Sequence, residues 1–304
     1  MTDEVKYRNS RGKSRSSSLP PLRRWIRATL TLDGALTLLV SLCGITGILV
    51  LVLITAYIVL QGARVISPAF LFEFPRKMGR EGGILPMIVT TFAVMATALG
   101  LTLLLGLGSA IYLAEYGRNN RVTKLLRFGI EVLAGIPSIL FGMFGFVFLV
   151  VLLKFGWSIL SGSLTLAFML SPTVARISEE AIRSIPREFR EEALVAGATR
   201  WKTIQTISLP LASRAIIGSL VLAIGRAIGE TAALILTVGS AIKIPMSLFD
   251  SARPMSIHIL LLAKEGISTE NCFGTVLVLF SIVTVIDFAA LWLTRRQAAS
   301  ASEW

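Results

Sequence analysis

The sequence has few of the residues from which metal centres and disulfide frameworks are built. Its 304 residues include two cysteines, Cys43 and Cys272, and one histidine, His258. Two thiols and one imidazole do not supply the four ligands of a structural zinc site. The chain also lacks a Gly-x-x-x-x-Gly-Lys-Ser/Thr loop, the phosphate-binding loop of many ATPases. We therefore expect no metal site, no catalytic residue and no cofactor bound by this chain.

Charged residues are also scarce. They make up 16% of the chain, against 54% hydrophobic residues, and the mean hydropathy is +0.75. A soluble domain has about a quarter charged residues, so the composition favours a polytopic membrane protein. A net charge of +12 suggests nucleic acid as a partner in a soluble protein. Here the positive-inside rule accounts for the charge, and no nucleic-acid partner is expected.

Six apolar segments are expected to cross the membrane as helices. A span needs about 20 apolar residues, and in lipid its backbone must bond internally. The segments cover residues 35–60, 84–112, 128–153, 157–175, 216–242 and 273–293. The third contains Gly135-Ile136-Pro137-Ser138, which predicts a kink, and serines dilute the fourth. The fold class is thus all-α, a polytopic membrane protein with six transmembrane helices in one membrane domain, residues 35–296.

The distribution of Lys and Arg orients the spans. Twenty-one of the 30 Lys and Arg residues fall in the amino-terminal segment, the second and fourth loops and the carboxyl end, and eight fall on the opposite side. Basic loops face the cytoplasm, so both termini are expected there. Because the two cysteines then lie at different depths, we expect no disulfide.

The ends of the chain differ from the membrane domain. Residues 1–34 are rich in Lys, Arg and Ser, a composition that cannot bury a core. We expect a flexible basic cytoplasmic arm attracted to anionic membrane lipid. Its polar lead is too long for a cleavable signal. Residues 297–304 are expected to be a cytoplasmic tail.

A charged segment, about residues 178–210, interrupts the apolar pattern between the fourth and fifth spans. Within it, Glu188, Glu191 and Glu192 fall near the start of an expected short helix, where acids complement the helix dipole. Gly197 can end that helix in a left-handed cap. Lipid does not tolerate such a segment, so it must lie outside the bilayer and contact another surface there.

The run EEALVAG at residues 191–197, a gap of nine residues and the run ISLP at residues 207–210 resemble the signature of ABC-importer permeases. One position departs, because Glu192 stands where the family usually has alanine. The resemblance implies the type I permease fold and a cytoplasmic coupling helix that docks into an ATPase subunit. The residues implied in this contact are Glu191, Glu192, Ala193, Gly197, Ile207, Leu209 and Pro210. The alternative without a coupling role is an ordinary amphipathic surface helix that ends at a glycine.

Two charges lie in the fifth expected span. Arg226 falls about ten residues into it, near the expected midplane, and Glu230 follows four residues later, on the same face of a helix. Charges at that depth are costly and face protein or a water-filled path. One interpretation is a structural ion pair. The other is a substrate path in which Arg226 binds an oxyanion, with Glu230 orienting it and Thr231 beside it.

The run RAIGET at residues 226–231 and the run EGGILP at residues 81–86 resemble permeases of the phosphate-specific transport system, and the following residues resemble the PstA type. The resemblance implies an inorganic phosphate importer of the bacterial inner membrane. Its implied partners are a second permease (PstC type), two ATPase subunits (PstB type) that hold ATP and magnesium, and an extracytoplasmic phosphate-binding protein (PstS type).

Several alternatives stay open. The cargo could be another oxyanion, such as sulfate or molybdate, because one Arg does not distinguish them. A proton-coupled secondary transporter could use Glu230 and Asp287, although such a carrier needs no coupling segment. An intramembrane enzyme is a third alternative, but this sequence has neither the metal-binding motif nor the nucleophile that such an enzyme needs. The apolar outer loop, residues 243–271, is either a docking surface for a binding protein or a segment packed on the spans. Glu131, one turn from Arg127, is expected to pair or to snorkel.

Overall fold

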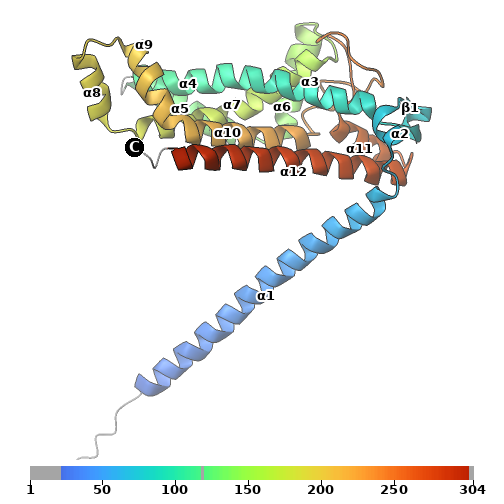
Figure 1. Cartoon of the computed structure of the whole chain (residues 1–304), viewed down its shortest axis with the longest axis horizontal. Helices are drawn as coiled ribbons and strands as arrows, with labels where there is room; N and C mark the ends of the chain where they lie inside the picture. Colours follow the sequence, from blue (N-terminus) through green and yellow to red (C-terminus); the bar gives the residue numbers. More distant parts are fainter. Residues whose placement is uncertain (1–21, 118–119, 301–304) are drawn as a thin grey trace, which may run out of the picture. The chain divides into compact units, whose positions relative to one another are not determined.

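The structure, a computed structural model, is built almost entirely of helices (Figure 1). It describes residues 22–117 and 120–300. The chain divides into two units, residues 1–57 and 58–304, which are considered separately. Helix α1 (Leu22–Ala63) contains the first expected span, and the most apolar 18-residue window of its stretch Asp33–Ala63 has no buried residue. The predicted arm lies outside the described residues up to residue 21, and from Leu22 to residue 34 it is helical.

The second unit begins with α2 (Pro68–Phe72) and a small antiparallel hairpin, β1 (Pro75–Arg76) and β2 (Glu81–Gly82), joined by η1 (Lys77–Gly79). A continuous helix then runs over Leu85–Tyr116. Its parts are α3 (Leu85–Thr102), η2 (Leu103–Leu107), α4 (Gly108–Ile111) and η3 (Tyr112–Tyr116). This helix contains the second expected span.

The third expected span is broken. Helix α5 (Arg121–Ala134) and the pair α6 (Ser138–Gly145) and η4 (Phe146–Leu152) meet at an angle of 104°. Pro137 causes this break, because it donates no backbone hydrogen bond and disfavours helical geometry at the residue before it. The break predicted at residues 135–138 is therefore confirmed, and the two helices on either side of it make up the third expected span. Five described helices are long and apolar enough to cross a membrane, and the bent pair makes six when counted as one span.

Helix α7 (Ile159–Arg183) is the centre of the bundle. It packs along α3 on one side and α10 (Leu209–Gly229) on the other, side by side in Figure 1. Leu166 and Leu170 are buried in the core around it. The serines that dilute its hydropathy are packing contacts, since Ser163 Oγ donates to the carbonyl of Val94 (3.1 Å). Small residues and hydroxyls of this kind allow helices in membranes to approach closely.

The fifth expected span, residues 216–242, was placed too far along the chain. The helix runs from Arg200 to Gly229 through α9 (Arg200–Thr203), η5 (Ile204–Ser208) and α10. Residues 231–254 form turns instead. Carbonyls of Thr237, Leu248 and Asp250 accept hydrogen bonds from the free N–H groups at the start of α7, as a buried helix end requires. Its first part is apolar because protein buries residues such as Leu234 and Val238, and periodicity alone does not separate such a stretch from a helix.

The chain ends with α11 (Met255–Lys264) and α12 (Thr269–Ser300). In α11, Met255, Ile257, His258 and Leu262 are buried, and the helix contacts both α12 and α3. Helix α11 therefore fits the interpretation in which the outer loop packs on the spans. Helix α12 contains the sixth expected span over Thr269–Ala290.

Candidate coupling segment and substrate path

Helix α8 (Arg187–Val195) stands at one end of the helical bundle, and the hairpin β1–β2 lies at the other end (Figure 1). None of its residues is buried. Its exposed side chains include apolar ones, since Val195 is 88% exposed and Phe189 is 50% exposed. Glu188, Glu191 and Glu192 line an open hollow together with Val195 and Ala196. A helix with exposed apolar and acidic side chains fits a contact with another protein.

Gly197 ends α8 as expected, in a left-handed conformation with φ +87°. The N–H of Gly197 donates to the carbonyl of Leu194 (3.0 Å), and that of Ala198 donates to the carbonyl of Ala193 (3.0 Å). A side chain at Gly197 would meet open space in this chain. The backbone conformation is therefore the reason for glycine within the chain, and the free space above it remains for a partner.

The predicted coupling residues fall into two groups. Glu191, Glu192 and Ala193 lie on α8, with Gly197 directly after it. Ile207 lies in η5, while Leu209 and Pro210 begin α10. Leu209 packs on a buried cluster that contains Ile182 and Ile185. The first group thus lies on or next to the exposed helix α8, and the second lies where the next long helix begins, with Leu209 packed in the bundle.

Sequence reasoning missed a residue that ties α8 to three long helices. Arg190 Nε lies 3.1 Å from Glu115 Oε1 of η3. Its Nη2 donates to the carbonyl of Ile182 near the end of α7. Ser208 Oγ at the start of α10 donates to the same Glu115 oxygen (2.6 Å). Because Glu115 and Arg190 are far apart in sequence, only the folded chain reveals this contact.

We call Glu115, Arg190, Ser208 and the Ile182 carbonyl the Arg190 joint. The side chains of Arg190 and Glu115 are 18% and 12% exposed, so water screens this pair less than a surface pair. Each member belongs to a different helical segment. A displacement of α8 therefore pulls on three long helices through one guanidinium.

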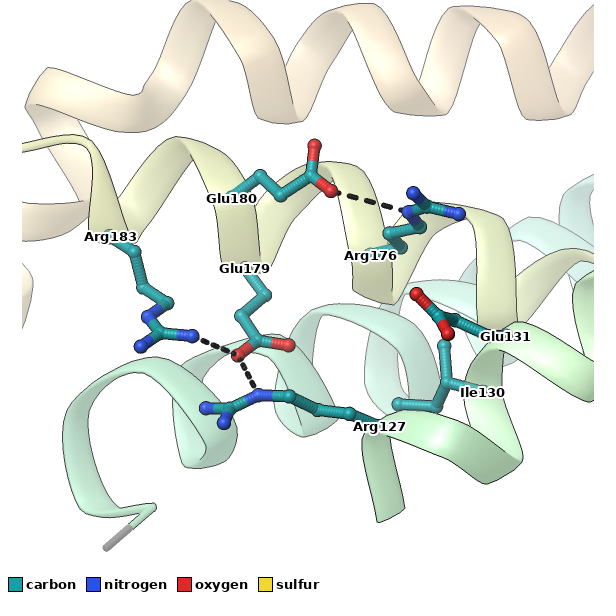
Figure 2. Close-up of a pocket in the computed structure, with 7 residues that line it drawn as sticks. All are labelled: Arg127, Ile130, Glu131, Arg176, Glu179, Glu180 and Arg183. Atoms are coloured by element: carbon teal, nitrogen blue, oxygen red, sulfur yellow. Dashed lines mark hydrogen bonds and ion pairs between the residues drawn. The ribbon is translucent and has the colours of Figure 1, made fainter. Parts of the chain in front are cut away.

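A second charged cluster ties α5 to α7 (Figure 2). Arg127 Nε lies 2.7 Å from Glu179 Oε1, and Arg183 Nη1 lies 3.5 Å from the same oxygen. Arg127 Nη2 also donates to the carbonyl of Leu113 (3.1 Å). Of the two expectations for Glu131, the ion pair with Arg127 is not formed, because Arg127 reaches across to α7, and Glu131 itself is exposed. Nearby, Arg176 pairs with Glu180 on the surface (3.2 Å).

Arg226 and Glu230 do not form the predicted pair. Helix α10 ends at Gly229, so Glu230 leaves the helical face, and its Oε1 accepts from the N–H of Ala233 (3.4 Å). Within the described part of the chain, Arg226 makes no ion pair or hydrogen bond, and it is exposed. Thr231 Oγ1 donates to the carbonyl of Gly229 (3.4 Å). The structural ion pair is thus absent among the described residues.

The packing of α10 on α7 gives the position of Arg226 along the helical bundle. Ser219 Oγ lies 3.5 Å from Ser178 Oγ, and the contacts of the Arg190 joint show that the two helices run in opposite directions. Because the helices are antiparallel, counting back along α7 from Ser178 to Ser171 matches counting forward along α10 from Ser219 to Arg226. Ser171 is midway along α7. Arg226 of α10 is therefore exposed and level with the middle of α7.

Comparisons with known proteins agree on one family. The sequence profile described as "Binding-protein-dependent transport system inner membrane component" matches residues 103–299. A "Probable ABC transporter permease protein YqgI" of Bacillus subtilis is 32% identical over 277 residues, which cover 86% of this chain and 94% of that protein. A "Phosphate transport system permease protein PstA 1" of Mycobacterium tuberculosis is 33% identical over 223 residues, covering 71% and 72% of the two chains.

Solved structures support the fold alone, because their sequence identities are low. A chain of a bacterial alginate ABC transporter has a TM-score of 0.63 at 17% identity and covers 91% of this chain and 96% of that one. A chain of the MetNI methionine ABC transporter in an inward-facing conformation has a TM-score of 0.57 at 16% identity, covering 70% and 96%. Both are similar in fold to this chain.

Proposed function

The chain belongs to the inner-membrane components of binding-protein-dependent transport systems, the permease subunits of ABC importers, and from this premise we propose that it imports inorganic phosphate. It forms half of the translocation path and couples that path to ATP hydrolysis by partner subunits. Two observations support phosphate as the substrate. Arg226 of α10 is exposed and unpaired among the described residues and lies level with the middle of α7, and several relatives are named phosphate permeases.

Arg226 is the proposed contact for the travelling oxyanion. A guanidinium is planar, stays charged and offers parallel N–H groups that match two oxygens of one anion. Glu230 and Thr231 follow at the end of α10, where the backbone leaves the helix. Asp287 of α12 lies beside Gly225 and adds a negative charge near the path. We expect this charge to keep the anion from binding too tightly to be released.

Helix α8 is the proposed coupling helix. Its exposed apolar and acidic side chains meet the ATPase subunit, and the open space above Gly197 admits close approach. When the ATPase subunits close, α8 moves, and the Arg190 joint passes that movement to η3, α7 and α10. ATP and magnesium belong to the ATPase subunits, and this chain holds neither.

The proposed assembly contains a PstC-type permease, two PstB-type ATPase subunits and a PstS-type binding protein on the far side of the membrane. Both termini and α8 face the cytoplasm in this proposal, as the distribution of basic residues favours. The cytoplasmic location of α8 is what allows an ATPase to reach it.

Thiol labelling is expected to confirm this orientation. Met246→Cys, at a position 91% exposed, should react in intact cells with a membrane-impermeant maleimide unless the binding protein shields it. Val195→Cys, 88% exposed, should react only after permeabilisation. Ser256, an outer-loop residue, is a poor reporter because it is buried. Labelling of Val195→Cys in intact cells would invert the topology and remove α8 from contact with an ATPase.

The cargo is tested by uptake in cells that lack the gene and carry it on a plasmid. We expect the chain to restore uptake of labelled phosphate at low external concentration, because the remaining subunits need this half of the path. Unlabelled phosphate and arsenate should compete, since both present similar protonated tetrahedral oxygens, and sulfate and molybdate should not. Competition by sulfate or molybdate instead of phosphate would assign the permease to another oxyanion.

A further inference from the structure

Two buried nitrogen atoms near the start of α11 have no hydrogen-bond partner. Arg253 is 4% exposed and His258 is 1% exposed. Among the buried side-chain nitrogen and oxygen atoms of the described residues, only Arg253 Nη1 and His258 Nδ1 are without a partner. Unpaired buried polar atoms are rare in native proteins and call for an explanation. The two residues lie five positions apart around the start of α11, and the charge of Arg253 acts on His258, so we look for one cause for both.

Arg253 has no direct counter-ion among the described residues. Arg253 Nε donates to the carbonyl of Ser240 (2.9 Å), but no carboxylate of the described residues forms an ion pair with the guanidinium. Burial lowers the pKa of Arg253 and the negative charge of Glu265 acts against this shift, and the guanidinium stays protonated at neutral pH. Burial and the nearby Arg253 lower the pKa of His258 to about 4, so the imidazole is neutral. The pair thus offers one cation and one neutral ring nitrogen.

The surrounding backbone adds positive potential. Helix α11 begins two residues after Arg253, and the start of a helix carries partial positive charge. A buried cation beside a helix start is unfavourable unless an anion joins them. The Met255 N–H donates to Thr91 Oγ1 (2.9 Å), and Ser256 Oγ donates to the carbonyl of Glu230 (2.9 Å). The second contact connects this place to the end of α10, beyond Arg226.

A turn of the hairpin covers His258. A side chain at Gly79 would lie 2.6 Å from His258 Cε1, so the imidazole packs directly beneath this glycine. Lys77, Met78 and Gly79 all have positive φ, at +47°, +62° and +100°. Such backbone is strained for the two residues with side chains and persists only where its surroundings hold it. The turn is therefore a cover that a change in those surroundings can release.

We propose that Arg253 and His258 form a second oxyanion site, which binds inorganic phosphate when the turn at residues 77–79 moves aside. The guanidinium donates to the anion, and the neutral ring nitrogen bonds another of its oxygens or their proton. The site lies one contact from Glu230, so the anion reaches Arg226 next. The class of anion rests on the proposed function, whereas the existence of the site rests on the buried unpaired nitrogens.

The test is the melting temperature of the purified complex with and without inorganic phosphate. The Arg226→Gln complex has a weakened phosphate contact at position 226. Phosphate should still raise its melting temperature by binding at Arg253 and His258. Adding Arg253→Gln should remove that rise. Lys243→Gln is the matched control, because it removes an exposed cation of the same loop that pairs with Asp250, and it should leave the rise unchanged. Ligand that binds only the folded state raises its stability in this way.

The outcomes separate the site from the cargo. If phosphate raises the melting temperature equally with and without Arg253, phosphate is a ligand of the complex but does not bind at Arg253, and the proposed site is wrong. If sulfate or molybdate raises the melting temperature in a way that depends on Arg253, and phosphate does not, the site is supported. Phosphate as the transported anion is then wrong. No rise with any of the three anions overturns the site. If Arg253→Gln fails to assemble, Arg253→Lys keeps the cation without the planar fork, and its rise should be smaller than that of the parent.

Discussion

Arg226→Gln is expected to abolish most phosphate uptake while the complex assembles normally. A charge-assisted hydrogen bond contributes about 1.5–3 kcal/mol, so its loss corresponds to roughly 10- to 100-fold weaker transport at limiting phosphate. Assembly should persist, because Arg226 is exposed and has no partner among the described residues. The measurement is the initial rate of labelled phosphate uptake, normalised to the amount of complex recovered from the membrane.

Companion variants separate this role from a structural one. Arg226→Lys keeps the charge without the fork and should retain an intermediate rate. Arg176→Gln removes an exposed cation whose surface pair with Glu180 contributes little, and its uptake should equal that of the parent. The double variant Arg226→Gln with Glu230→Gln should be as inactive as the single one. Recovered uptake in the double variant would show that the two charges merely balance each other.

Arg190→Gln combined with Glu115→Gln is expected to uncouple ATP hydrolysis from transport. The double variant removes both charges of the Arg190 joint, so neither is left buried without its partner. We expect the complex to assemble and to hydrolyse ATP, while the number of phosphate ions moved per ATP falls severalfold because the movement of α8 no longer reaches the long helices. Both quantities are measured on the same preparation in proteoliposomes.

Lys202→Gln is the control for this variant, because Lys202 is an exposed cation close to α8 outside the joint. Its ratio of phosphate to ATP should be unchanged. A double variant in the joint that transports at the parental ratio would mean that α8 acts on the spans by another route. A complex that loses its ATPase subunits would instead show that the joint holds α8 in shape for docking.

Much of the architecture could be predicted from the sequence, because most spans are apolar over their whole length. The left-handed Gly197 and the end of α8 were likewise predictable from local chemistry. Residues 231–242 were not, because a buried irregular segment is as apolar as a helix, and its backbone is satisfied by the start of α7. That end of α10 also separates Arg226 from Glu230, which helical periodicity had placed together.

The residues of the Arg190 joint show a different limit. Arg190 stands in a run of charges with no local sign of its role, and Glu115 lies at the end of another helix. Only tertiary packing brings them together. Conversely, Ser163 weakened the prediction of α7 as a span, although its hydroxyl bonds across to α3. Hydropathy measures the preference for lipid, whereas the central helix of the bundle contacts protein.

The most direct test of the central claim is ATP-driven uptake by the reconstituted complex. Proteoliposomes containing this chain, the second permease, the ATPase subunits and the phosphate-loaded binding protein should accumulate labelled phosphate when ATP and magnesium are supplied to the side that α8 faces. Vesicles with a catalytically inactive ATPase should accumulate none, and neither should vesicles lacking this chain. Phosphate uptake that proceeds without ATP hydrolysis, or that follows a proton gradient instead, would contradict the account.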